Sequence, residues 1–306
     1  MNIGIVGLGR MGANMARRLA RGGVRVTGFD PDEGVRRSLA AESISGVGSL
    51  ADLVEQLPAP RVVWLMVPAG APTQQAIDDL AALLAPGDLL VDGGNANYHD
   101  SQRRGAALAS RGIRFADCGV SGGVHGLANG YALMFGGSAE AAAMLAPYAT
   151  ILAPAPDAGW LHCGPVGAGH FVKMIHNGIE YGMMQALAEG FALMHNRQDL
   201  ELDVAKIAQM WREGSVVRSW LLDLVAAFLA DDPDLADVAP VVADSGEGRW
   251  TVQEALEQRI AAPVLTLALM ARFTSQGGGD YANKLLAMMR KSFGGHALAH
   301  VDSRKR

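Results

Sequence analysis

The sequence predicts a chain in two parts: an α/β domain built on a doubly wound parallel sheet, followed by an all-α domain. Apolar runs of strand length alternate with helix-like stretches at first, and these strand signals stop after about residue 165. Strands that are apolar throughout are typical of a parallel sheet covered on both faces. With 306 residues, enough for two domains of ordinary size, we expect domains at 1–165 and 166–306.

The predicted sheet has five strands in the N-terminal part, each a short apolar run bounded by glycine, proline or aspartate. A glycine-rich turn and a helix to about Ala20 follow the first of them. The runs are NIGIVG (2–7), VRVTGF (24–29), RVVWLMV (61–67), DLLVDGG (88–94) and IRFADCG (113–119).

The predicted C-terminal domain is a series of helices joined by two loops, at 231–240 and 274–280. Thr251 and Glu254 have the spacing of a capping box, which predicts a helix starting at Val252. The other expected helices run from near Gly167 to about Met194, over 203–213 and 216–230, from Pro263 to about Phe273, and over about 281–292.

Composition excludes several classes of partner. The net charge is −5, so we expect neither nucleic acid nor an anionic membrane as a partner. The N-terminus lacks a basic region, and the apolar segment 261–271 is shorter than the roughly 20 residues of a membrane span. Cys118 and Cys163 are expected to be reduced core thiols. The histidines show no metal-ligand spacing, and a cytoplasmic enzyme without a metal is the expected class.

The turn after the first strand predicts a dinucleotide site. GLGRMG matches G-x-G-x-x-G between a strand and a helix, as in a Rossmann-like fold, and Asp30 ends the second strand. Asp30 would bind a ribose hydroxyl and repel a 2′-phosphate, so we expect NAD rather than NADP; Arg10, Arg36 and Arg37 are near enough in sequence to soften that preference. The expected cofactor residues here are Gly7, Leu8, Gly9, Arg10, Met11, Gly12 and Asp30.

A second candidate site lies on the helix beginning near Gly167. In GHFVKMIHNGIEYG (169–182) five polar side chains fall within roughly 140° of one helix face. Buried charges in a mostly apolar helix are costly unless they are used. The five are Lys173, His176, Asn177, Glu180 and Tyr181.

Several motifs together resemble the decarboxylating 6-phosphogluconate dehydrogenases, in particular their short, often NAD-linked form, within the β-hydroxyacid dehydrogenases. They span nearly the whole chain in the family's order. The motifs are GLGRMG (7–12), MVPAG (66–70), VDGGNANYHDS (91–101), GVSGGVHGLANG (119–130), GAGHFVKMIHNGIEYG (167–182), GEGRWT (246–251) and RKSFGGH (290–296).

The resemblance implies a role for each matching residue. Lys173 would be the base for the substrate hydroxyl, and Glu180 the acid that protonates carbon after CO2 leaves. Substrate hydroxyls and the carboxylate would be bound by Asn95, Ser121, Gly122, Gly123, His176 and Asn177. The substrate phosphate would be bound by Tyr181, Arg272, Arg290 and His296. The nicotinamide ribose side of the cofactor would be lined by Val67, Pro68 and Ala69, and Asn95 would contact both cofactor and substrate.

The resemblance also implies a homodimer or homotetramer, since the family's C-terminal tail reaches a partner's active site. One segment departs from the family pattern: a phosphate-binding lysine is replaced by Ser245, and a threonine by Glu247. An added carboxylate near a dianion is unfavourable, which leaves the phosphorylation of the substrate open.

The function that the resemblance implies is NAD-linked oxidative decarboxylation of 6-phospho-D-gluconate to D-ribulose 5-phosphate, in the pentose phosphate pathway. One alternative is a β-hydroxyacid dehydrogenase for a smaller or unphosphorylated sugar acid. Another is a non-catalytic NAD-binding sensor, which would be expected to have lost Lys173 or Glu180.

Overall fold

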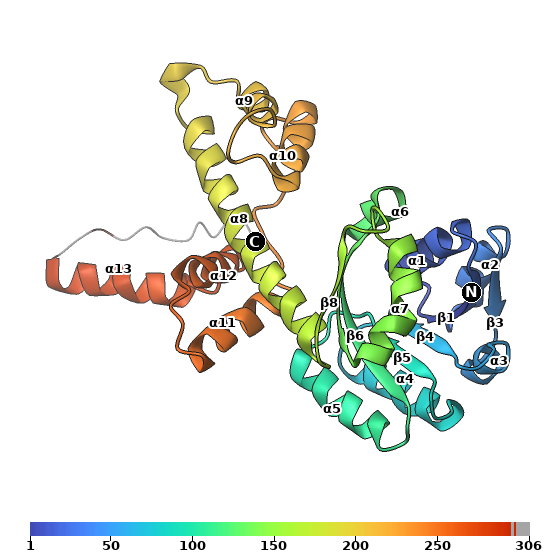
Figure 1. The fold of residues 1–306 in the computed structure, drawn as a ribbon. Helices are drawn as coiled ribbons and strands as arrows, with labels where there is room; N and C mark the ends of the chain where they lie inside the picture. Colours follow the sequence, from blue (N-terminus) through green and yellow to red (C-terminus); the bar gives the residue numbers. More distant parts are fainter. Residues whose placement is uncertain (295–296, 298–306) are drawn as a thin grey trace. The chain divides into compact units, whose positions relative to one another are not determined.

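The computed structural model describes residues 1–294 and 297 and divides into two compact units, Met1–His176 and Asn177–Arg306. The first unit contains an eight-stranded sheet of order β3-β2-β1-β4-β5-β6-β7-β8 (Figure 1). All neighbouring strands pair in parallel except β6 and β7. The strands are β1 Asn2–Val6, β2 Arg25–Phe29, β3 Ile44–Val47, β4 Val62–Leu65, β5 Leu89–Asp92, β6 Arg114–Ser121, β7 Ala132–Gly137 and β8 Trp160–Gly164.

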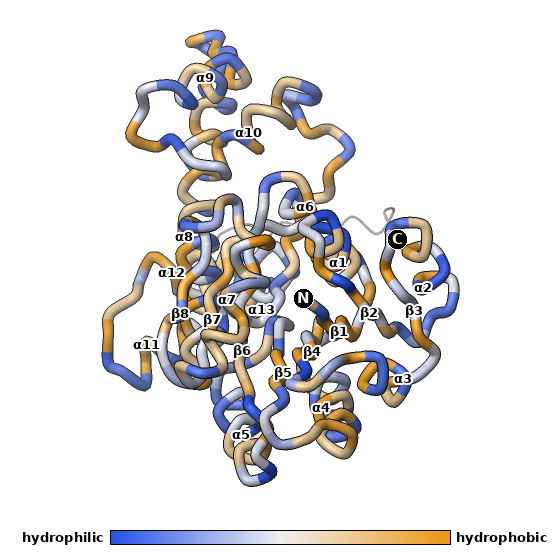
Figure 2. The backbone as a smooth tube through the Cα atoms, turned by 45° about the vertical axis from the view of Figure 1, so that its right-hand side comes forward, coloured by the Kyte–Doolittle hydropathy of each residue, from blue (hydrophilic) through white to orange (hydrophobic). Residues whose placement is uncertain are grey.

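Helices cover both faces of this sheet, as the continuous apolar strands predict. In β4, Val62 and Trp64 pack into a core shared with α1 and α7, while Val63 and Leu65 pack into a second core shared with α3, α4 and α5. Figure 2 shows β1 and β4 as largely hydrophobic. The helices of this unit are α1 Arg10–Arg21, α2 Glu33–Ala40, α3 Leu50–Glu55, α4 Ala71–Leu83, α5 Tyr98–Ala109, α6 Gly126–Asn129 and α7 Ala139–Leu152, with a 3-10 turn at Gly123–His125.

The second unit is helical, and its core consists of two small clusters. Phe191 of α8 packs with α9 and α10, whereas Tyr181 of α8 packs with Ala268 and Leu269 of α12. The helices are α8 Ala168–His195, which starts in the first unit, α9 Val204–Trp211, α10 Trp220–Asp231, α11 Glu247–Glu257, α12 Pro263–Ser275 and α13 Asp280–Gly294, with a 3-10 turn at Gln198–Leu200. Within the described residues, no helix has the length and apolar character of a membrane span.

The fold class is confirmed, but several predicted elements are corrected. Sequence reasoning missed β3, β7 and β8. The helix predicted from Val252 begins at Glu247 instead, so Thr251 is not its cap; its hydroxyl donates to the Glu247 carbonyl in mid-helix. The helix predicted from Val216 begins at Trp220, because the Ser219 hydroxyl caps it by accepting from Leu222 N.

Candidate active site

The predicted cofactor turn connects β1 to α1. Gly7 has φ +88°, and a Cβ on Gly12 would lie 1.9 Å from the Gly7 carbonyl oxygen, so both positions require glycine. A Cβ on Gly9 would meet nothing within 4 Å, and α1 begins at Arg10 with no side-chain cap. Open space beside uncapped helix N–H groups fits a bound pyrophosphate. The other predicted members of this turn, Leu8 and Met11, are buried and half-buried.

Asp30 lies directly beside this turn. Its carboxylate accepts hydrogen bonds from Leu8 N (2.8 Å) and Asp32 N (3.0 Å), which holds a negative charge at the end of β2. Arg36 donates to the backbone carbonyls of Asp30 and Pro31, and Arg37 pairs with Glu33 at 2.6 Å. Two of the three nearby arginines therefore have protein partners, and the geometry fits a ribose hydroxyl better than a 2′-phosphate.

The turns after β4 and β5 pack against the glycine turn. A Cβ on Gly7 would lie 2.5 Å from the Met66 carbonyl oxygen and 3.0 Å from Val67 Cγ1, and a Cβ on Gly94 would lie 2.9 Å from the Val67 carbonyl oxygen. Pro68, Ala69 and Asn95 are exposed. The structure thus gathers the predicted cofactor residues of three separate motifs at the carboxyl ends of β1, β4 and β5, where open α/β sheets bind ligands.

Lys173 is buried, with 8% of its surface exposed. A Cβ on Gly119 of β6 would lie 2.2 Å from Lys173 Cβ, so the lysine packs directly on this glycine. The buried Asp117 carboxylate, also on β6, accepts from Gly167 N (2.6 Å) and His170 N (2.7 Å) and anchors the first turn of α8. The strand therefore fixes both the start of α8 and the position of its lysine.

Ser121, at the end of β6, contacts α8 on the same side as this lysine. Its hydroxyl lies 3.4 Å from His176 Nε2. Gly122 and Gly123 follow with φ of +126° and +50°, which only glycine adopts readily. Within the first unit, the structure brings together Lys173, His176 and the predicted substrate-binding strand end.

The remaining predicted side chains of α8 belong to the second unit. Asn177 and Tyr181 are buried and Glu180 is half-buried. Glu180 follows Lys173 by seven residues on one continuous helix, which separates them by about 10 Å along its axis.

A polar cluster surrounds Tyr181. Its hydroxyl lies 3.3 Å from Asp244 Oδ1 and 3.2 Å from Ser245 Oγ, and the Arg272 guanidinium stacks 3.5 Å from the centre of its ring. Arg272 also donates to the Ala243 carbonyl at 2.7 Å. Two predicted phosphate ligands, Tyr181 and Arg272, are therefore adjacent.

The residues that depart from the family pattern lie in the same cluster. The Ser245 hydroxyl donates to the buried Glu247 carboxylate, and Arg249 forms an ion pair with Asp244. Arg249 also lies over the Phe273 ring at 5.3 Å. Each position thus has a partner inside the unit, and the two carboxylates offset the positive charge of the two arginines.

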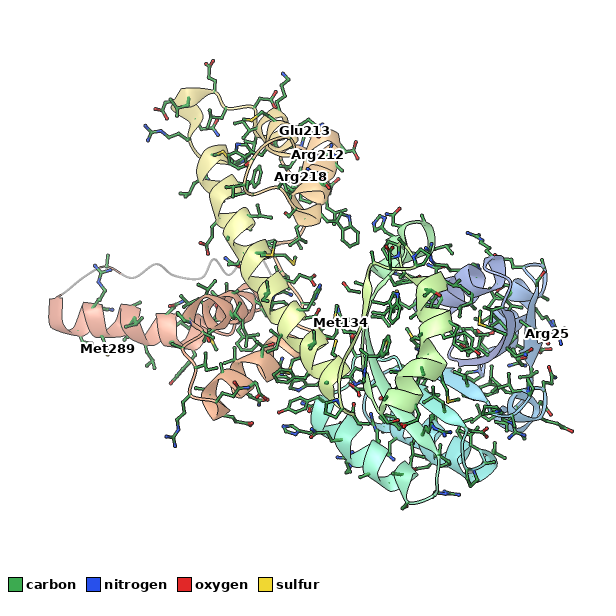
Figure 3. The ribbon with its side chains drawn as sticks, in the orientation of Figure 1. Arg25, Met134, Arg212, Glu213, Arg218 and Met289 are labelled. Atoms are coloured by element: carbon green, nitrogen blue, oxygen red, sulfur yellow. The ribbon has the colours of Figure 1, made fainter. Side chains whose placement is uncertain are left out.

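The other two predicted phosphate ligands, Arg290 and His296, belong to the C-terminal tail of the sequence. Arg290 is exposed on α13, the helix that carries the labelled Met289 in Figure 3. His296 lies outside the described residues, so its expected role stays a prediction.

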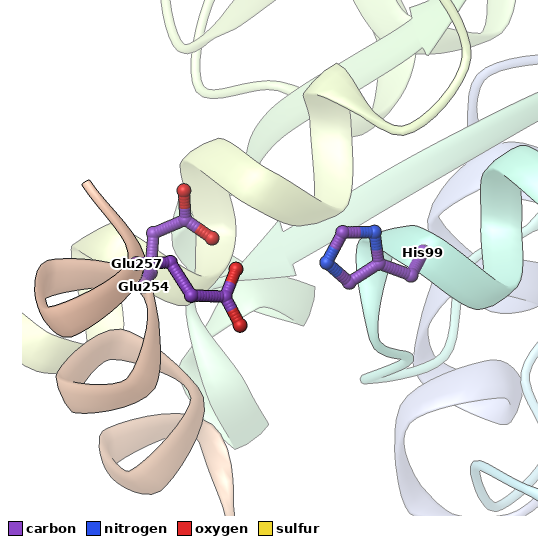
Figure 4. Close-up of side chains that lie close together, drawn as sticks. All are labelled: His99, Glu254 and Glu257. Carbon is purple, nitrogen blue, oxygen red and sulfur yellow. The ribbon is translucent and has the colours of Figure 1, made fainter.

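Among the residues that the structure describes, three potential metal ligands come from different units. Figure 4 shows Glu254 and Glu257 of α11 and His99 near the start of α5. Because the histidine belongs to the first unit and the glutamates to the second, the three do not define a site.

Sequence reasoning missed two buried carboxylates that shape the site, Asp92 and Asp117. Both stand within or at the end of otherwise apolar strands, and that interruption is the signal that would have identified them. Cys163 is also only half-buried, so the expectation of two core thiols holds for Cys118 alone.

Comparison with known proteins identifies relatives over nearly the whole chain. Residues 2–155 match the NAD binding domain of 6-phosphogluconate dehydrogenase, and residues 169–292 match the C-terminal domain of the same enzyme. An NAD(+)-dependent, decarboxylating 6-phosphogluconate dehydrogenase of Haloferax volcanii is 41% identical over 99% of this chain and 100% of its own length.

Longer relatives share the same region. A Bacillus subtilis enzyme of the same description is 36% identical over 90% of this chain and 61% of its own length. The solved 6-phosphogluconate dehydrogenase of Plasmodium falciparum, studied with NADP+ and with 6-phosphogluconate, has a TM-score of 0.84 at 27% identity, over 100% of this chain and 67% of that one. The chain belongs to the 6-phosphogluconate dehydrogenase family.

Proposed function

We propose that this protein catalyses the oxidative decarboxylation of 6-phospho-D-gluconate to D-ribulose 5-phosphate with NAD. The observation that carries the proposal is Lys173, buried against Gly119 in the same unit as the glycine turn and Asp30. The full-length similarity to the Haloferax enzyme supports the same reaction.

In this proposal NAD, when bound, supplies the acceptor for the hydride that leaves substrate C3. The neutral Lys173 amine accepts the proton of the C3 hydroxyl, and the resulting ammonium donates a hydrogen bond to the new carbonyl oxygen. That contact stabilises negative charge on this oxygen as the bond from C2 to the carboxylate breaks and CO2 leaves. A lysine serves as such a base near neutral pH only when burial and neighbouring cations lower its pKa.

The carbon that loses CO2 then needs a proton. Glu180 donates it in this scheme, which converts the enediol to the ketose phosphate. Ser121, Gly122, Gly123, His176, Asn177 and Asn95 would hold the carboxylate and hydroxyls of the substrate. Tyr181 and Arg272, adjacent in the structure, would face its phosphate together with Arg290 and His296.

A second substrate is favoured by one specific observation. Glu247 and Asp244 place two carboxylates among Arg249 and Arg272, and Glu247 is held by Ser245. A charge-balanced cluster suits a terminal hydroxyl better than a dianion, so an unphosphorylated sugar acid is the competing substrate.

One experiment distinguishes these substrates. Initial rates with 6-phosphogluconate and gluconate, each with NAD and NADP, should give the highest kcat/KM for 6-phosphogluconate with NAD, with one CO2 per NADH. A higher kcat/KM for gluconate would favour the second substrate, and NADH without CO2 would exclude the decarboxylating reaction.

The proposal includes a cytoplasmic homo-oligomer, at least a dimer, in which the C-terminal tail completes a partner's site. Exposed apolar side chains on α13 support it, namely Leu285, Leu286, Met288 and Met289. Sedimentation velocity should give a dimer or tetramer mass, and a monomer at micromolar concentration would contradict this part of the proposal.

A further inference from the structure

Arg104, on α5, is a buried cation outside the proposed catalytic set. Its side chain is 1% exposed and pairs with Asp92, whose side chain is 0% exposed, with Nη1 3.0 Å from Oδ2. A buried ion pair costs desolvation and is weak evidence for stability alone. Its position suggests another use.

The guanidinium joins three segments of the chain. Nε donates to Gln74 Oε1 (3.1 Å) on α4, and Nη2 donates to the Gly70 carbonyl (3.3 Å) at the end of the turn after β4. The paired Asp92 carboxylate also accepts from Gly94 N at 3.1 Å, in the turn after β5. One cation therefore ties the turn at 66–70 to the turn at 92–95.

These two turns pack closely against each other, and the turn at 66–70 also packs against the glycine turn, so neither can move alone. The strand order reverses between β1 and β4, and that switch point is where open α/β sheets bind ligands. Val67 lies in contact distance of both Gly7 and Gly94. A shift of either turn would therefore move the backbone that faces the nicotinamide half of the cofactor.

We propose that Arg104 is a positioning residue for the nicotinamide half of NAD: with Asp92 it fixes the spacing between the turn carrying Val67, Pro68 and Ala69 and the turn carrying Asn95. The inference rests on the proposed assignment of these turns to the cofactor. Arg104 acts through the turns and leaves the adenine half, bound by the glycine turn and Asp30, unaffected.

The chain offers a matched control on the same two strands. Arg61 and Asp88 pair at 3.1 Å immediately before β4 and β5, at the end of these strands opposite to the cofactor turns, and Asp88 also accepts from Arg61 N and Ala85 N. This pair also joins β4 to β5 through a buried aspartate. It differs in standing at the amino ends of the strands, away from the cofactor turns.

The test compares Arg104→Lys with Arg61→Lys in the full chain. Lysine keeps the charge but cannot donate to three acceptors in fixed directions. Binding of NAD and of ADP, which lacks both the nicotinamide and its ribose, is measured by calorimetry, and folding by thermal unfolding. For Arg104→Lys we expect the Kd of NAD to rise about tenfold or more, as for a small misplacement of a binding group, with the Kd of ADP unchanged. Arg61→Lys should lower only the thermal midpoint.

Two results would overturn the proposal: equal weakening of NAD and ADP, or unchanged NAD affinity in a folded Arg104→Lys protein. If that variant does not fold, Gln74→Leu removes the contact to Arg104 Nε, together with an exposed hydrogen bond from Gln74 to Asp78. It should raise the Kd of NAD, not that of ADP, by about fivefold; an unchanged Kd would contradict the role. Because binding is measured without substrate, a wild type that binds NAD but does not oxidise 6-phosphogluconate would refute the proposed function alone.

Discussion

At the scale of single residues, the candidate site depends on where a charged side chain is buried. Lys173 could be selected from the sequence, since a lysine in an apolar helical segment is unusual. Its close packing on Gly119 could not be predicted, because it depends on how α8 packs against β6; a Cβ on Gly119 would lie 2.2 Å from Lys173 Cβ. Residue identity was thus predictable, whereas the supporting contacts of Asp92, Arg104 and Asp117 required the fold.

Lys173→Met is expected to reduce kcat by about a thousandfold or more, the usual range for losing a general base. Methionine keeps the volume of the buried stem, so folding should be maintained. NADH formation gives the rate, and NAD binding by calorimetry serves as the control. Turnover within tenfold of wild type would remove Lys173 from the mechanism.

The two thiols are expected to react slowly at neutral pH. Burial, followed by the charge of Asp117, raises the pKa of Cys118 well above its ordinary value, and the same two causes raise the pKa of Cys163. A raised pKa means less thiolate at a given pH, so alkylation should accelerate only at more alkaline pH. Mass spectrometry after iodoacetamide at pH 7.5 checks this; labelling of Cys163 as fast as glutathione would contradict it.

At the scale of elements, the strongly apolar runs were predictable except β7, which was missed although four of its residues are buried, and the marginal runs were not predictable. Each of the five predicted runs contains four or more buried residues. In contrast, β3 has only four residues, of which the two in the middle are exposed, and β8 has no buried position. The start of α11 was misplaced because Gly246, with φ +102°, ends the preceding loop without a side-chain signal.

The seating of α8 on β6 can be tested with two glycine substitutions. Gly119→Ala forces a methyl group against Lys173, and we expect a loss of about 1–3 kcal/mol in stability and about tenfold or more in kcat. Gly190→Ala on the same helix meets nothing within 4 Å; it should raise stability by about 0.5–1 kcal/mol and leave kcat unchanged. Unfolding in urea and initial rates measure both, and a fully active Gly119→Ala protein would contradict the proposed packing.

At the scale of the whole molecule, the division into an α/β part and a following helical part could be predicted from the sequence. The change from strands to helices was visible in the pattern, and the α/β unit with a helical unit after it is confirmed. The predicted boundary at residue 165 stays a prediction, since α8 begins in one unit and ends in the other. The oligomeric state could be predicted only from the family resemblance, because exposed apolar side chains alone do not show which surface they bind.

NAD should stabilise the folded protein, because it binds only the native state. At a hundred times its Kd the expected gain is about 2.7 kcal/mol, which corresponds to an increase of about 5 °C or more in the thermal midpoint of the cofactor unit. NADP at the same concentration should give a smaller increase, since Asp30 repels the 2′-phosphate. A scan of midpoint against concentration for both cofactors checks this, and a larger effect of NADP would contradict the role of Asp30.

The continuity of α8 limits which insertions and substitutions this chain can accept during evolution. The proposed base and acid stand on one uninterrupted helix, so their mutual orientation is set by helical phase. A single-residue insertion between them would rotate one by about 100° away from the other. Surface loops tolerate changes of length, but this stretch does not, so within α8 substrate preference can change only through replaced side chains.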